Sequence, residues 1–158
     1  MKKNISIVIP SYNEASNIDK LLASLNETIN ALPYSFKIIF VDDGSKDETV
    51  SKLKEIASQQ DNVYYVELSR NFGHQNALKA GLDLSDADAV ISMDGDLQHP
   101  PALIPELIKH WENGVDIVYT IRKDHQEVPM MKRKTSNMFY NLMNSLSDIE
   151  LEAGTADL

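Results

Sequence analysis

Short apolar runs alternate with amphipathic segments along this chain, and this alternation restricts the fold more than any other feature. The apolar runs cover residues 5–9, 36–41, 63–68, 89–93 and 116–120, so that one begins about every 25 to 30 residues. Segments with helical spacing of apolar residues separate them. Strands that alternate with helices form parallel sheets with helices on both faces. The sequence therefore predicts an α/β fold with a mostly parallel central sheet, in which the run at 89–93 is a buried strand.

Helices are expected after each of the first four strands. The clearest spans residues 18–29, where apolar residues recur along one face and Ser16 or Asn17 can cap the first turn. A second helix includes residues 50–57, with Ser45 or Asp47 as its cap. A third covers residues 76–84 and a fourth covers residues 103–111.

The totals restrict the function as well. The chain has 158 residues, of which 15 are basic and 24 acidic, giving a net charge of −9. This length fits a single domain over residues 1–158. The acidic balance argues against nucleic-acid binding, which requires a basic face. Because there is no cysteine, disulfides and thiolate zinc sites are excluded. No apolar run approaches the roughly 18 to 20 residues needed to cross a bilayer, so we expect a soluble, cytoplasmic chain.

Polar clusters follow four of the predicted strands. They are residues 12–14, 42–43, 70–71 and 94–96, which carry the sequences Tyr-Asn-Glu, Asp-Asp, Arg-Asn and Asp-Gly-Asp. Ligands of open parallel sheets bind beyond the carboxyl ends of the strands, where such clusters meet. The sequence therefore predicts one site built from four loops.

The fourth cluster has the composition of a metal site. Asp94 and Asp96 follow the strand directly, Gly95 allows the backbone to turn between them, and Gln98 adds an amide oxygen. An all-oxygen set of this kind suits Mg²⁺ or Mn²⁺ and does not suit zinc. We expect His99 to support this turn and not to bind the metal. The alternative for the segment at 94–96 is a solvated acidic turn without a metal.

Other motifs narrow the chemistry further. The chain lacks the glycine patterns of dinucleotide-binding and P-loop folds and the Gly-x-Ser-x-Gly turn of serine hydrolases. A metal-assisted nucleotide site remains. Tyr12 offers a flat ring on which a base could stack, and Asp42 or Asp43 could accept a hydrogen bond from a base N–H. The alternatives are a tyrosine at the edge of the core and a pair of helix-capping aspartates.

Three segments together resemble the inverting family 2 glycosyltransferases. They are residues 9–14 (Ile-Pro-Ser-Tyr-Asn-Glu), 41–45 (Val-Asp-Asp-Gly-Ser) and 94–101 (Asp-Gly-Asp-Leu-Gln-His-Pro-Pro). The chain is most similar to the polyprenyl-phosphate branch, which includes dolichol-phosphate mannosyltransferase and bactoprenol glucosyltransferase. Residues 69–73 and 133–146 resemble the bactoprenol type. The resemblance covers essentially the whole chain and implies a GT-A fold, over residues 1–158 as one catalytic domain.

The resemblance also implies roles for single residues. The nucleotide would contact seven of them: Pro10, Tyr12, Asn13, Glu14, Asp42, Asp43 and Asp94. Asp43 would read the base, with Asp42 beside it. The catalytic set would be Asp94, Asp96, Arg122 and Asp157, and the metal ligands Asp94, Asp96 and Gln98. Arg122 would lie near the phosphates; otherwise it is an exposed arginine after a strand.

The acceptor implied by the resemblance is a polyprenyl phosphate. A phosphate monoester is already largely ionised near neutral pH, so it needs cations to hold it more than a base to activate it. Lys132, Arg133 and Lys134 open a basic amphipathic helix that could meet an anionic membrane or a lipid phosphate. The alternative is an ordinary packed helix with a solvated basic end.

Two other functions remain open at this stage. One is the same chemistry with a saccharide hydroxyl as acceptor, as in polysaccharide or capsule synthesis, and the other is a donor-binding module without turnover. Because residues 154–158 resemble the start of the family's Gly-x-x-Asp-Phe-Arg segment, we expect a catalytic domain without its C-terminal acceptor or membrane region. The full-length protein would lie at the inner face of the cell membrane.

Overall fold

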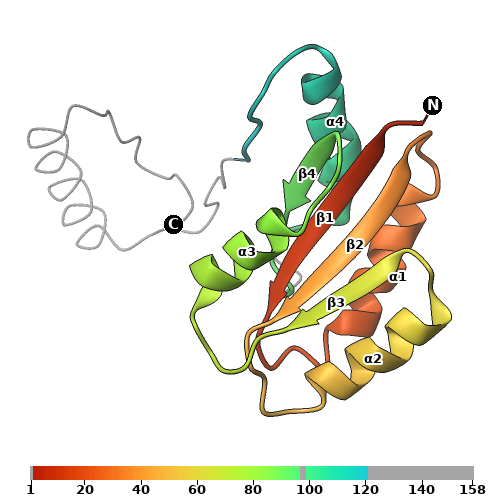
Figure 1. Ribbon diagram of the computed structural model, residues 1–158. Coiled ribbons are helices and arrows are strands. Elements are labelled where there is room, and N and C mark those ends of the chain that lie inside the picture. The colour runs from red at the N-terminus through yellow and green to blue at the C-terminus, as the bar shows by residue number, and fades with distance from the viewer. Residues whose placement is uncertain (1, 97–98, 121–158) are drawn as a thin grey trace, which may run out of the picture. The chain divides into compact units, whose positions relative to one another are not determined.

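The computed structural model of the protein describes residues 2–96 and 99–120 (Figure 1). The chain divides into two units, residues 1–113 and 114–158, and all the described helices and strands belong to the first. Several residues singled out in the sequence lie outside the described residues, namely Gln98, Arg122, Asp157 and the helix that Lys132, Arg133 and Lys134 open.

The first unit is built on a parallel sheet of four strands. These are β1 (Asn4–Ser11), β2 (Ser35–Asp42), β3 (Val63–Glu67) and β4 (Ala89–Ser92), in the order β3-β2-β1-β4. β1 pairs in parallel with β2 along its whole length, from Asn4 opposite Ser35 to Ser11 opposite Asp42. On its other side β1 pairs with β4, and β3 extends the sheet beyond β2. The predicted α/β class is confirmed.

Helices cover both faces of this sheet, as Figure 1 shows. They are α1 (Ile18–Ile29), α2 (Thr49–Gln59), α3 (His74–Asp83), the 3₁₀ turn η1 (Pro101–Leu103) and α4 (Ile104–Glu112). α1, α2 and α4 pack on one face, against a core that includes Ile5, Ile7 and Phe40. α3 covers the other face, where Ala77 packs with Val8 and Val41.

The starts of two helices differ from the expected caps. Asn17 holds the N-cap position of α1, but its side chain makes no capping bond and instead donates to Glu14 Oε2 at 2.6 Å. α2 begins one residue after Glu48, so neither Ser45 nor Asp47 is its formal cap. Asp47 still accepts the Thr49 N–H at 3.0 Å, which satisfies one of the free donors of the first turn.

Two of the expected strands need correction. Residues 116–120 form no strand, and the side chains of Ile117 and Tyr119 are 80% and 64% exposed. An apolar run becomes a strand only by pairing with another one, and composition does not reveal whether a partner exists. The strand at 89–92 is present but not fully buried, since Val90 is 40% exposed. Within the described residues β4 pairs with β1 alone, as an edge strand does.

One glycine lets α3 pack directly against two valines of the sheet. A Cβ atom added to Gly81 would lie 2.3 Å from Val8 Cγ1 and 2.9 Å from Val41 Cγ2. Both valines are completely buried, and their branched side chains have little rotamer freedom with which to move aside. The missing side chain therefore sets the distance between α3 and the two central strands.

Replacing Gly81 by alanine should destabilise the protein, although the same change inside a helix is normally stabilising by about 1 kcal/mol. The added methyl group overpacks the α3–sheet contact, and we expect a net loss of about 1 to 3 kcal/mol in the free energy of unfolding. Urea unfolding followed by circular dichroism measures this. Gln75→Ala, at an exposed position of the same helix, is the control. An unchanged or raised stability of the Gly81 variant would show that α3 can move away from the sheet.

Candidate functional site

The candidate site lies where the strand order reverses. The chain moves from β1 to β2 and β3 on one side of the sheet and then returns to place β4 on the other side of β1. The loops that leave β1 and β4 therefore start side by side at the carboxyl edge. This is the position at which open parallel sheets bind their ligands.

The segments after β1 and β4 lie next to each other at this edge. A Cβ atom added to Gly95 would lie 3.4 Å from Ser11 Oγ, 3.5 Å from the Pro10 carbonyl oxygen and 3.6 Å from Glu14 Cγ. The structure thus brings together two groups of residues that the sequence analysis placed in one site, those at 10–14 and those at 94–96.

Asp94 is held by two histidines from different parts of the chain. Its Oδ1 lies 2.9 Å from Nε2 of His74, the first residue of α3. Its Oδ2 lies 3.3 Å from Nδ1 of His99, a contact that lacks the alignment of a hydrogen bond. His99 thus lies beside Asp94, but its role in supporting the turn stays a prediction, whereas the contact of His74 was missed. Its place directly after the polar loop that follows β3 was the available signal.

The fit of a divalent cation depends on the two carboxylates. In the loop after β4, Asp94 is half-buried and Asp96 is exposed, while Gln98 is outside the described residues. Among the described residues no group of three or more His, Cys, Asp or Glu side chains is arranged to hold a metal. Mg²⁺, however, is usually bound by one or two protein carboxylates together with substrate phosphates. The donor set therefore fits a cation that arrives with a nucleotide, and does not fit a cation enclosed by protein alone.

The two aspartates after β2 have different environments. Asp43 is 3% exposed, and its oxygens accept the backbone N–H groups of Phe72 at 2.7 Å and Gly73 at 2.9 Å. Asp42 is completely buried; its Oδ2 accepts the Ser45 N–H at 3.0 Å, whereas its Oδ1 has no hydrogen-bond partner. Asp43 thus fixes the loop after β3, and Asp42 keeps one acceptor unused. The contact of either residue with a base stays a prediction.

The loop after β2 also packs tightly against the loop after β3. Gly44 has a φ of +70°, and a Cβ atom there would lie 2.5 Å from the Arg70 carbonyl carbon. Only glycine fits this position, because both the left-handed backbone and the close approach exclude a side chain. The Arg70 guanidinium in turn lies over the Phe72 ring, 4.5 Å from its centroid.

Asn13 joins the first two motif loops through an unusual backbone conformation. It is the one non-glycine residue with positive φ, +57°, in the described chain. Its N–H donates to Ser45 Oγ at 2.8 Å, and its Oδ1 accepts the Lys46 N–H at 2.8 Å. The preceding side chain, Tyr12, is 39% exposed, so its ring remains accessible to a stacking partner.

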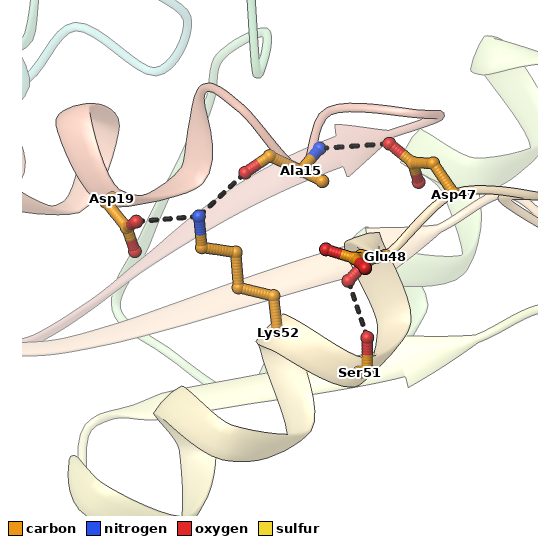
Figure 2. Close-up of polar contacts among 6 residues, drawn as sticks. All are labelled: Ala15, Asp19, Asp47, Glu48, Ser51 and Lys52. Atoms are coloured by element: carbon orange, nitrogen blue, oxygen red, sulfur yellow. Dashed lines mark hydrogen bonds and ion pairs between the residues drawn. The ribbon is translucent and has the colours of Figure 1, made fainter.

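A second set of contacts, to Asp47 and to Lys52 of α2, holds the same loop, as Figure 2 shows. Ala15 donates its N–H to Asp47 Oδ2 at 3.3 Å, and its carbonyl accepts a bond from Lys52 Nζ at 2.8 Å. Lys52 also pairs with the Asp19 carboxylate at 2.6 Å. The backbone at Ala15 is therefore held on both sides, which fixes the start of α1 relative to α2.

The ionisation of Asp47 favours this arrangement. Partial loss of hydration raises the pKa of the Asp47 carboxyl group, but the hydrogen bonds that it accepts from Thr49 and Ala15 lower the pKa by more. The net pKa lies below the usual value of 3.8. The carboxylate therefore contributes stability that is present at neutral pH and is lost as the pH falls through its folded-state pKa.

Comparisons with known proteins agree with this geometry. The family model described as "Glycosyl transferase family 2" matches residues 6–155. The uncharacterized glycosyltransferase sll0501 of Synechocystis sp. is 42% identical over 157 residues, which are 99% of this chain and 49% of that protein. The bactoprenol glucosyl transferase of Shigella phage SfV is 40% identical over 153 residues, 97% of this chain and 50% of that protein. The chain thus spans about half the length of these relatives.

A solved structure shows the same fold. Glucosyl-3-phosphoglycerate synthase of Mycobacterium tuberculosis, crystallised with Mn²⁺, UDP and glucosyl-3-phosphoglycerate, superposes with a TM-score of 0.55 at 25% identity. The match covers 69% of this chain and 39% of the synthase.

Replacing Asn13 should separate the two functions of this residue. Asn13→Gly accepts the left-handed backbone without strain but loses the bond to Lys46, whereas Asn13→Ala loses the same bond and also strains the backbone through its Cβ atom. We expect the alanine variant to be less stable than the glycine variant by about 1 kcal/mol. Chemical unfolding of the two variants beside wild type measures the difference. Equal stabilities would show that the positive φ is not strained for a residue with a Cβ atom.

Proposed function

Because the chain belongs to glycosyl transferase family 2 and has a GT-A fold, we propose that it transfers a sugar from a nucleoside-diphosphate sugar to an acceptor, with inversion at the anomeric carbon. One observation supports this above the others: Gly95 lies so close to Pro10, Ser11 and Glu14 that a Cβ atom added to it would be within 3.4 to 3.6 Å of all three. It joins the nucleoside-binding segment expected at 10–14 to the carboxylates of Asp94 and Asp96 at the switch point of the sheet. Such a pairing suits a ligand with a base at one end and a diphosphate at the other.

The nucleoside end of this site would be formed by the first two motif loops. Tyr12 presents an accessible ring for stacking. Asp43, with Asp42 beside it, is the residue proposed to accept a ring N–H of the base, such as that of uracil or guanine; both carboxylates are buried in the structure. The proposed donor substrate is accordingly a UDP- or GDP-linked sugar.

The diphosphate end would be bound together with Mg²⁺ or Mn²⁺. Asp94, Asp96 and Gln98 are the residues that would hold this cation. Its chemistry is to stabilise the negative charge that develops on the departing diphosphate. The chain's own residues would position the substrate: Asp94, which is hydrogen-bonded to His74, and the loop at 10–14 are the groups that would orient the phosphates. Correct placement of the reacting groups is the main requirement of an in-line displacement.

The proposed acceptor is a polyprenyl phosphate. In the transfer, an acceptor phosphate oxygen forms a bond to the anomeric carbon as the bond to the nucleoside diphosphate breaks, and the diphosphate leaves with the electron pair. The relative from phage SfV is called a bactoprenol glucosyl transferase, and bactoprenol is a polyprenol. Arg122 and the cluster at 132–134 provide cations in the sequence for an anionic lipid. We place the full-length protein at the inner face of the cell membrane on the same grounds. In the described residues no helix could span a membrane.

Removing one carboxylate should separate metal-dependent from metal-independent nucleotide binding. Asp96→Asn deletes a negative charge that would face the cation, and we expect Mn²⁺-dependent affinity for UDP or GDP to fall about tenfold or more, which corresponds to about 1.4 kcal/mol. Isothermal calorimetry with and without Mn²⁺ gives both values. Asp61→Asn removes the same charge from an exposed loop away from the site and serves as the control. Equal Mn²⁺-dependent affinities in wild type and Asp96→Asn would exclude Asp96 as a ligand.

The acceptor can be tested with two lipids that differ only in the phosphate. We expect radiolabelled sugar to move from the donor to a polyprenyl phosphate and not to the polyprenol of equal length, because the phosphate is the ionised nucleophile. Extraction of the lipid phase and scintillation counting measure the transfer. Transfer to a saccharide hydroxyl instead would favour a role in polysaccharide synthesis. Donor binding without transfer to any acceptor would indicate a binding module.

A further inference from the structure

We propose that His74 is a positioning residue, which orients the Asp94 carboxylate so that it can bind the cation and nucleotide of the reaction proposed above. This inference rests on that proposed function. It concerns a residue that lies 20 positions before the Asp-Gly-Asp segment and on a different element, at the start of α3.

The hydrogen bond between the two residues has a defined direction. An ionised carboxylate can only accept, so the proton between His74 Nε2 and Asp94 Oδ1, 2.9 Å apart, belongs to the imidazole ring. His99 Nδ1 lies 3.3 Å from the other oxygen, Oδ2, without hydrogen-bond alignment. The carboxylate is thus fixed mainly through Oδ1, and His99 limits its rotation from the opposite side.

This arrangement leaves Asp94 able to bind a ligand. A carboxylate has about four lone-pair sites, and the two histidines occupy at most one on each oxygen. The remaining sites can face a cation or a ribose hydroxyl while the side chain stays in place. A ligand carboxylate that is hydrogen-bonded from outside binds its metal in a fixed orientation, and loss of such a partner typically weakens metal affinity about 10- to 100-fold.

The position of His74 is itself fixed from the end of β2. The two residues before it, Phe72 and Gly73, donate their backbone N–H groups to the buried carboxylate of Asp43. Gly73, with a φ of +93°, then turns the chain into α3. A continuous series of contacts therefore runs from Asp43, at the proposed nucleoside end, through His74 to Asp94, at the proposed diphosphate end.

A purely stabilising role would fit these contacts less well. The side chains of His74 and Asp94 are 54% and 39% exposed, and polar pairs with this much exposure contribute little to stability. Removing the bond should therefore change the orientation of Asp94 and leave the free energy of unfolding almost unchanged. This difference separates a positioning residue from a structural one.

The experiment compares His74→Leu with His74→Gln in the full 158-residue chain. Leucine has a similar size but no donor, whereas the amide nitrogen of glutamine can replace Nε2. His110→Gln, at an exposed position of α4, is the matched control. Electron paramagnetic resonance measures Mn²⁺ affinity in the presence of saturating UDP, and of GDP in a parallel series. Calorimetry measures nucleotide affinity without metal, and thermal unfolding measures stability.

We expect His74→Leu to weaken Mn²⁺ binding about tenfold or more, with metal-free nucleotide affinity and melting temperature close to wild type. His74→Gln should restore most of the affinity, and His110→Gln should equal wild type. If the leucine variant does not fold, His74→Asn replaces it, because the shorter amide cannot reach Asp94.

Two results would overturn the inference alone: wild-type Mn²⁺ affinity in His74→Leu, or equal losses in the leucine and glutamine variants. If wild type binds neither UDP nor GDP with Mn²⁺, the proposed function fails, and this inference fails with it.

Discussion

The parallel pairing of β1 on both of its sides is the constraint on which the rest of the structure depends. β1 is buried along nearly all its length and pairs with β2 on one side and β4 on the other. Because β1 is central, the strand order reverses there, and α3, which leads from β3 back to β4, covers the face of the sheet opposite to α1 and α2. The reversal in turn places the loops after β1 and β4 next to each other. The candidate site is therefore a consequence of which strand is central.

Hydrogen bonds between loops then convert this placement into a fixed geometry. The loop at 11–17 is joined to the loop at 43–49 through Asn13, Ala15 and Glu14, whose N–H donates to Thr49 Oγ1 at 2.9 Å. The loop after β3 is held by Asp43, and the loop after β4 contacts β1 through Gly95. Most of these bonds pair a backbone group with a side chain of another loop. The conformation of each loop therefore depends on contacts with the other loops.

Much of the fold could be predicted from the sequence, because its signals are local. Apolar runs and helical spacing predicted four strands and four helices close to their observed bounds, and the carboxyl-edge rule gathered the loops. The strand expected at 116–120 was wrong, since strand formation depends on a partner that a local pattern does not identify. The His74–Asp94 bond was missed for a related reason: it joins residues on separate elements, and only the packing of α3 brings them together. The buried state of Asp42 and the close contact at Gly44 likewise follow from tertiary structure alone.

The bonds between Asp43 and the loop after β3 have a consequence for which side chains of this loop can be exchanged. The side chains of Arg70 and Phe72 are exposed and take no part in the bonds that Asp43 makes, which use only the backbone N–H groups of Phe72 and Gly73. The path of the loop and the identity of its exposed side chains are therefore independent. Evolution or an engineer can exchange the residues at these two positions, and with them the surface beside the site, without moving the backbone that carries His74.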